Sequence, residues 1–422
     1  MRRLIRWALL LIVLVGSGAV PGCGRGRISA QRASADLATA VQVRDVRVQL
    51  AGAAARVRVR VVGPFVVRSA RGQTVLSGHA LDWTTVRAEA GSGVVFGDRV
   101  LGLGVFDLSG MSPGAPVEVA VGTGTSWEGV HRYAGVIRFA AAGGDALQLI
   151  NVVDLETYVA CVLPGELFPH FEREAFRGQA IAVRTYALYQ MADRGGQAFD
   201  LSATHFSQVY HGLAGGSVQD RAREAAAYTR GIIATWSSPA GERIFCTYYS
   251  SCCGGWTQSV TNCRPDLPMI PPLAGGVRCD CLSVARGPKY RWPPLRISKG
   301  DLTSKLAARY GGVRSLGRIE GIEVVRQTEV GRPVTLRLVG ATGARFELPS
   351  EHFRLAVGSG TLRSTFCRIS TGREEVVFAD GRGFGHGMGM CQWGAQAMAL
   401  RGYGAGQILR HYYPGCNLTR VY

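Results

Sequence analysis

Glu166 is the first residue in this sequence whose surroundings suit chemistry. Its neighbours in residues 163–169 are mostly Leu, Pro and Phe side chains. A carboxyl group in apolar surroundings loses hydration of its charged form, so its pKa rises and it keeps a proton near neutral pH. Glu166 is therefore a candidate general acid. The competing interpretation is an exposed loop glutamate without a chemical role.

A glycine-rich segment, residues 381–394, is the second candidate. Glycine alternates there with larger side chains, among them His386. Because glycine lacks a Cβ atom, this alternation predicts a backbone that another segment approaches closely. No lysine follows the segment and no strand-helix unit surrounds it, which disfavours a phosphate-binding loop. Serine-hydrolase elbows, zinc-protease helices and Walker loops are also missing from the sequence, which excludes several hydrolase classes.

Cysteines form the third group, since six of the eleven lie between residues 246 and 281. If this loop folds back on itself, four of them fit a tetrahedral structural zinc ion: Cys253, Cys263, Cys279 and Cys281. In an oxidising compartment the same residues would instead form disulfides. We expect Cys391 to be a buried small apolar residue. No cofactor is expected for the chemistry itself.

The first 23 residues predict export. Three arginines precede the short apolar stretch 7–15, and small residues lead to Cys23. This order is typical of a signal peptide, and its end resembles a lipoprotein box, so Cys23 is a candidate lipidated N-terminus. Plain secretion is the alternative. We expect a protein of the cell envelope, in the periplasm or at the cell surface, that contacts the membrane only through its lipid anchor.

The charge balance favours an anionic partner. Lys and Arg number 48 against 30 Asp and Glu, which leaves a net charge of +18. No basic run is interleaved with aromatic residues, and no zinc finger, basic zipper or RNP motif occurs, so we expect no nucleic-acid partner. The 47% apolar composition excludes a disordered chain.

The periodicity of apolar residues predicts the helices and strands that carry these candidate residues. After a linker over 24–40, apolar and polar residues alternate from 41 to 67, and glycine-rich turns recur further on, which predicts a β-rich N-terminal region over 41–130. Asp154 caps a helix that Pro164 is expected to end, and a second helix runs from about 172 to 193, so Glu166 falls in the loop between them. Strand patterns return from about 320, and short helices near 394–400 and 405–413 close the chain. The fold class is α+β.

Several ordered blocks resemble the SpoIID/LytB family, the group of stage II sporulation protein D and the amidase enhancers. The blocks are NVVDLETYVACVLPGEL (151–167), EAFRGQAIAVRTYAL (174–188), QVYHG (208–212), CGGWT (253–257) and GHGMGMCQWGA (385–395) with its trailing HYYPG (411–415). The resemblance implies a mixed α/β SpoIID-like domain with a substrate groove, over residues 131–422, that binds peptidoglycan.

The resemblance also implies an activity. Sporulation members act as lytic transglycosylases on glycan strands that lack stem peptides, and they cleave the MurNAc-GlcNAc linkage to leave 1,6-anhydroMurNAc ends. The catalytic acid of the family maps to Glu166, and the groove-lining positions map to Arg184, Tyr186, His386 and Gln392. The alternative is a non-catalytic murein-binding protein that stimulates a cell-wall amidase, as the enhancer branch implies.

Overall fold

The structure is a computed structural model that describes residues 34–41, 45–123, 126–204 and 207–422. The expected signal peptide and Cys23 lie outside the described residues, as does most of the expected linker. Within the described ranges, no helix has both the length and the apolar character needed to cross a membrane.

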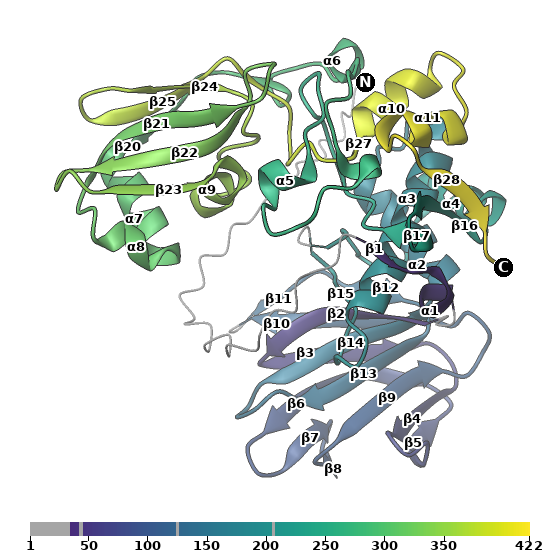
Figure 1. Cartoon of the computed structure of the whole chain (residues 1–422). Helices are drawn as coiled ribbons and strands as arrows, with labels where there is room; N and C mark the ends of the chain where they lie inside the picture. Colours follow the sequence, from purple (N-terminus) through teal and green to yellow (C-terminus); the bar gives the residue numbers. More distant parts are fainter. Residues whose placement is uncertain (1–33, 42–44, 124–125, 205–206) are drawn as a thin grey trace, which may run out of the picture.

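The N-terminal part is a β-sandwich of two seven-stranded sheets (Figure 1). One sheet contains β3 (Arg56–Val61), β6 (Leu81–Glu89), β7 (Gly93–Phe96), β8 (Arg99–Gly102), β10 (Val117–Thr123), β11 (Ser126–Trp127) and β12 (His131–Tyr133). The other contains β2 (Asp45–Ala54), β4 (Phe65–Ser69), β5 (Thr74–Gly78), β9 (Val105–Gly110), β13 (Val136–Ala141), β14 (Leu147–Asp154) and β15 (Leu201–Ser202). In β3 the valines are buried and the arginines between them are not, as the alternation predicts.

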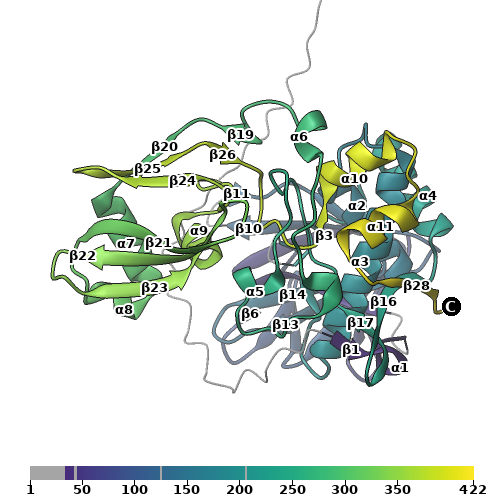
Figure 2. The same ribbon diagram turned by 45° about the horizontal axis from the view of Figure 1, so that its top comes forward.

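A group of helices packs together after the sandwich, and the first of them follows directly from β14. They are α2 (Leu155–Glu166), α3 (Arg173–Asp193), α4 (Gly216–Tyr228), α10 (Gln392–Ala399) and α11 (Ala405–Tyr412). The last two, drawn in yellow, pack on α3 although they lie about two hundred residues further along the chain (Figures 1 and 2). A small sheet beside α3 holds β1 (Ser34–Asp36), β16 (Ile232–Ser238), β17 (Gly241–Phe245) and β28 (Asn417–Arg420), with α1 (Leu37–Val41) next to it.

Residues 295–379 enclose a second hydrophobic core, separate from the first. Figure 2 shows this part on one side of the molecule, away from α10 and α11. Its elements are β20 (Leu295–Ser298), α7 (Lys299–Arg309), α8 (Gly311–Arg314), β21 (Ile319–Gln327), β22 (Pro333–Gly340), β23 (Arg345–Pro349), α9 (Ser350–Val357), β24 (Arg368–Thr371) and β25 (Glu375–Ala379). Two short strands, β19 (Arg291–Trp292) and β26 (Gly381–Arg382), pair at the junction with the rest of the chain.

The segments between the two cores are mostly irregular. They contain β18 (Tyr249–Ser250), α5 (Val260–Cys263), the 3-10 turn η1 (Pro271–Leu273), α6 (Cys281–Val284) and β27 (Met390–Cys391). The fully buried Arg332 joins the cores, because its guanidinium donates to the backbone carbonyls of Cys253, Trp256 and His386.

The α+β class and the β-rich N-terminal region are confirmed. The expected cap is also present, since the Asp154 carboxylate accepts from the N–H groups of Glu156 and Thr157.

The expectation that Pro164 ends the first helix is wrong. Pro164 lies inside α2, and Glu166 is the last helical residue rather than a loop residue. A proline leaves the carbonyl four residues earlier without its helical donor, here that of Ala160. The Gln219 side chain donates to that carbonyl at 3.0 Å, which removes much of the cost of the proline.

Candidate functional site

Glu166 stands at the carboxyl end of α2 with both carboxyl oxygens bonded. The backbone N–H of Val209 donates to Oε1 at 2.9 Å, and the Gln392 side chain donates to Oε2 at 3.0 Å. Gly165 makes the first contact possible, because a Cβ atom there would lie 3.0 Å from the Val209 carbonyl oxygen. The side chain is held in one orientation yet remains partly exposed, as a group that must reach a substrate has to be.

The environment of Glu166 favours its protonated form. Burial raises its pKa above the ordinary 4.5, and the hydrogen bonds from Val209, Gln392 and Tyr249 offset only part of this rise. The partial negative charge at the carboxyl end of a helix acts in the same direction as burial. Glu166 is therefore suited to donate a proton. Among the described residues, no second carboxylate is bonded to it or is among the groups that shift its pKa.

Gln392 reaches Glu166 because the glycine-rich segment folds against residues 248–254. Strands β18 and β27 pair in parallel, and Phe384 forms a bridge with Cys252. Alternate glycines have positive φ, and at Gly389 a Cβ atom would lie 2.0 Å from the Tyr248 carbonyl oxygen. The close approach that the alternation predicts is thus present, and glycine is needed for it.

Two tyrosines complete the polar surroundings of Glu166. Tyr158, about two turns earlier in α2, donates to the Gln208 side chain at 2.8 Å, and Tyr249 lies in β18. Burial raises the pKa of both phenols, and the nearby Glu166 carboxylate adds to this rise when it is ionised, so both phenols stay neutral. Sequence reasoning missed these tyrosines as site residues, although Tyr158 and Gln208 both fall within the blocks that resemble the SpoIID/LytB family.

Aromatic rings line the region beside Glu166. Phe168, two residues after the acid, has its ring 5.4 Å from that of Trp393, the neighbour of Gln392. Tyr290 contacts the same indole at 5.5 Å between ring centroids. Lys289 lies 5.8 Å from the Phe168 ring and 4.9 Å from the Phe384 ring. Aromatic faces with a cation beside them are suitable for stacking against sugars that carry negative charge.

Arg184 and Tyr186 lie in α3 and have no contact with Glu166. Arg184 is fully buried and forms a bidentate ion pair with Glu156, with N–O distances of 2.9 and 2.6 Å. Tyr186 is 7% exposed and packs edge-on against Tyr248. In this structure both residues serve the core rather than line a surface.

The contacts of His386 are with the glycine-rich segment and Tyr248 rather than with Glu166. Its Nδ1 accepts from the Met388 N–H at 3.0 Å, and its ring meets Tyr248 edge-on. Burial lowers its pKa to about 4, so the imidazole is neutral at pH 7. The described contacts give His386 the role of shaping the glycine-rich segment.

Four buried thiols converge between β18, α6 and β27. The sulfur atoms of Cys253, Cys279, Cys281 and Cys391 all lie within 4.8 Å of one another. Cys263 is not among them, because its sulfur points to the Gln258 side chain instead. Cys391 takes its place, and its sulfur accepts from the N–H groups of Cys253 and Gly394.

This donor set fits a closed tetrahedral metal site. Four cysteine thiolates are a usual set for structural zinc, and backbone N–H groups commonly bond to metal-bound sulfur. Burial raises the pKa of Cys253 and Cys391, so four thiolates without a cation would be unfavourable here. None of the ten cysteines in the described residues forms a disulfide.

Comparisons with known proteins support the resemblance to the SpoIID family. Residues 143–236, which include Glu166, match the family model SpoIID, Stage II sporulation protein. An uncharacterized protein of Brachyspira hyodysenteriae is 27% identical over 381 residues, 89% of this chain and 92% of that protein. Stage II sporulation protein D of Bacillus subtilis is 26% identical over 292 residues, 65% of this chain and 77% of that protein. The amidase enhancer of the same organism is 24% identical over 302 residues, 61% of this chain but only 40% of the enhancer.

Proposed function

Because the chain carries a domain of the SpoIID family, we propose that it is a lytic transglycosylase of the bacterial cell wall, with Glu166 as its acid and base. The observation that supports this most is Glu166 itself, partly exposed, with a raised pKa, and with no second carboxylate bonded to it in the described part of the chain. Hydrolytic glycosidases usually need two carboxylates, one as acid and one to serve water or attack the sugar. A transglycosylase needs only one.

The reaction is balanced without water. Glu166 gives its proton to the glycosidic oxygen between MurNAc and GlcNAc, and the bond from that oxygen to C1 breaks. The 6-hydroxyl of the same MurNAc attacks C1, and the Glu166 carboxylate takes the proton that this hydroxyl releases. Because nucleophile and electrophile belong to one ring, their effective concentration is high. The product is a 1,6-anhydro end.

Gln392 and the Val209 N–H have a positioning role in this scheme. They bond both carboxyl oxygens when the group is ionised, between the two proton transfers, and so stabilise the intermediate state. Both donors are fixed by the packing around the glycine-rich segment and Gly165. A metal bound by the four thiols would hold the segments 253–281 and 391–394 together and would take no part in the chemistry.

Digestion of peptide-free glycan strands with the purified chain, followed by mass analysis of the ends, tests the proposal. We expect anhydro ends from the wild type and a loss of about 10²- to 10⁴-fold in rate for Glu166→Gln. The matched control is Glu172→Gln, six residues away and exposed, which should cleave normally. Reducing ends, or wild-type cleavage by Glu166→Gln, would contradict the mechanism.

A second candidate is a murein-binding amidase enhancer, which the match to the Bacillus subtilis enhancer favours. A protein that only binds murein needs a binding surface for the glycan but no general acid. If the chain stimulates a cell-wall amidase, Glu166→Gln should stimulate it equally. Stimulation without any strand cleavage by the wild type would support the enhancer and remove the transglycosylase.

We also propose that the chain is exported and attached to the membrane through lipid on Cys23. The sequence of residues 1–23 supports this. In cells fed a labelled fatty acid, the wild type should carry label and sediment with membranes, whereas Cys23→Ser should do neither. If the wild type carries no label, the lipid anchor is excluded and secretion without an anchor is the remaining interpretation.

A further inference from the structure

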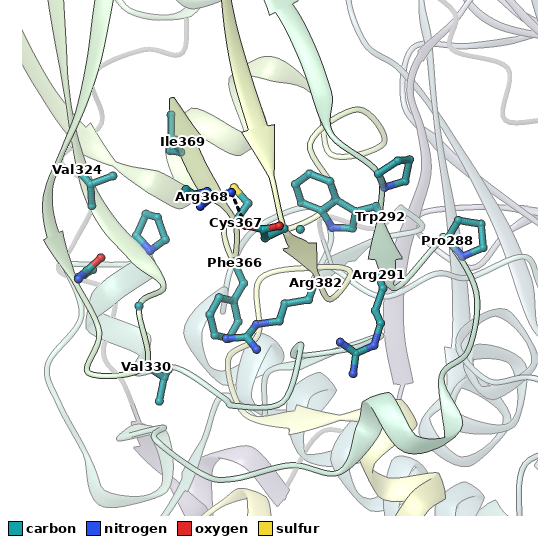
Figure 3. Close-up of a pocket in the computed structure, with 16 residues that line it drawn as sticks. Pro288, Arg291, Trp292, Val324, Val330, Phe366, Cys367, Arg368, Ile369 and Arg382 are labelled. Carbon is teal, nitrogen blue, oxygen red and sulfur yellow. Dashed lines mark ion pairs between the residues drawn. The ribbon is translucent and has the colours of Figure 1, made fainter. Parts of the chain in front are cut away.

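A pocket of about 930 Å³ lies where the second core meets the rest of the chain. Its lining comes from the paired strands β19 and β26, from β21 with the turn that follows it, and from the residues leading into β24 (Figure 3). It is distinct from Glu166 and its hydrogen-bond partners, none of which lines it. The mechanism proposed above makes no use of it.

Two neighbouring arginines line this pocket, and neither has a carboxylate partner among the described residues. Arg291 and Arg382 are directly opposite in the antiparallel β19–β26 pair, so their side chains leave the same face, opposite Trp292 (Figure 3). Like charges placed opposite each other across a strand pair are unfavourable. In the described parts of the chain, no carboxylate pairs with either guanidinium. The third arginine of the pocket, Arg368, differs because it pairs with Asp380 at 2.9 Å.

Aromatic rings hold these groups in place. The Arg382 guanidinium lies 3.8 Å from the centroid of the buried Phe366 ring, whose surroundings also include Arg332 at 4.5 Å. Trp292 packs on Gly381, where a Cβ atom would lie 2.1 Å from the indole. Burial and the charge of Arg291 lower the pKa of Arg382. Stacking fixes the direction of the guanidinium, so less freedom is lost when it binds an anion.

Lys289 links the edge of the pocket to the aromatic rings that follow Glu166 in the chain. Pro288 and Arg291, on either side of the Lys289–Tyr290 pair, line the pocket. Lys289 itself lies beside the rings of Phe168 and Phe384. A strand that passes Glu166 and Phe168 would therefore meet a cation and then the paired arginines.

We propose that the Arg291–Arg382 pair binds the carboxylates of an anionic sugar strand, namely the free lactyl carboxylates of peptide-free glycan. This proposal rests on the proposed function, and it names the residues that would select peptide-free glycan as the substrate. A MurNAc that carries a stem peptide has an amide where the free sugar has a carboxylate, so it offers no charge at that atom. The guanidinium pair, which suits bidentate carboxylates, discriminates between the two forms.

Binding measured separately from cleavage tests this inference. The Glu166→Gln chain is titrated with GlcNAc-MurNAc oligosaccharides bearing free lactyl carboxylates, and with the same oligosaccharides after amidation. We expect the carboxylate form to bind about ten-fold more tightly, and Arg291→Gln or Arg382→Gln to remove that preference. Arg368→Gln is the matched control, since its guanidinium already has a carboxylate partner, and it should keep the preference.

The outcomes distinguish a failure of the arginine site from a failure of the proposed cleavage reaction. Equal affinity for the two forms, or a preference that survives in both arginine variants, would overturn the inference even if the wild type cleaves strands. An arginine-dependent preference would support it even if no cleavage is found. Tighter, arginine-dependent binding of strands that carry stem peptides would assign the carboxylate to the peptide and would also overturn it.

Discussion

Replacing Arg184 with methionine is expected to destabilise the fold without changing the surroundings of Glu166. Arg184 is fully buried, and besides the bidentate pair with Glu156 it donates to the carbonyls of Ile232 at 3.0 Å and Ala226 at 3.2 Å. Methionine fills much of the same volume but leaves Glu156, largely buried, without its cation. Removing one partner of a buried ion pair costs about 3–5 kcal/mol.

The loss should depend on pH. Burial alone would raise the pKa of Glu156, but the hydrogen bonds and charge of Arg184 outweigh it and lower that pKa below 4.5. A carboxyl group with a lowered pKa contributes stability above its unfolded-state value, and this contribution is lost as the pH falls through the folded-state value. The difference between wild type and Arg184→Met should therefore be complete at pH 7 and shrink below about pH 4.5.

Urea unfolding followed by circular dichroism measures the free energy, and glycan binding is measured on the same samples. Arg173→Met, at the exposed start of the same helix, is the control and should unfold like the wild type. Replacing both partners with apolar residues should recover part of the loss. If Arg184→Met unfolds at the wild-type urea concentration but no longer binds glycan, Arg184 belongs to the groove and our assignment to the core is wrong.

Three further predictions concern the acid and the thiols. Because the pKa of Glu166 is raised, ionisation of this carboxyl group lowers the stability of the fold above about pH 4.5. Calorimetry should therefore find Glu166→Gln more stable than the wild type at pH 7 and equally stable in acid. Equal stability at pH 7 would show that the pKa of Glu166 is not shifted. Gly165→Ala places a Cβ atom against Val209, so the rate of strand cleavage should fall about ten-fold. The circular dichroism spectrum should stay the same. An unchanged cleavage rate would show that this contact does not position Glu166. Elemental analysis should find zinc in the purified wild type and in Cys263→Ser, but not in Cys391→Ser. Disulfides among the four thiols, detected by mass spectrometry, would exclude the zinc site.

Local rules were sufficient where neighbours in the sequence decide the outcome. The Asp154 cap, the helix over 173–193 and the alternation in β3 each depend on residues within a few positions of one another. The apolar neighbours of Glu166 likewise predicted the raised pKa of its carboxyl group. Gln392, by contrast, was a candidate only through the resemblance to the family.

Local rules failed where the deciding partner is distant. Pro164 does not end its helix, because Gln219 donates the missing hydrogen bond to the Ala160 carbonyl, 59 residues away from it. Cys391 replaces Cys263 among the converging thiols, because the pairing of β18 with β27 brings it to Cys253 across 138 residues. Neither contact has a signal in the spacing of the residues involved.

The sequence by itself determined the α+β class and the start of the helix that carries Glu166. Only the tertiary structure decided which groups meet that acid, which thiols converge, and that Arg184 and Tyr186 belong to the core. The physical reason is that helices and strands form from short-range backbone preferences and periodic burial, whereas hydrogen bonds between distant segments depend on how those elements pack.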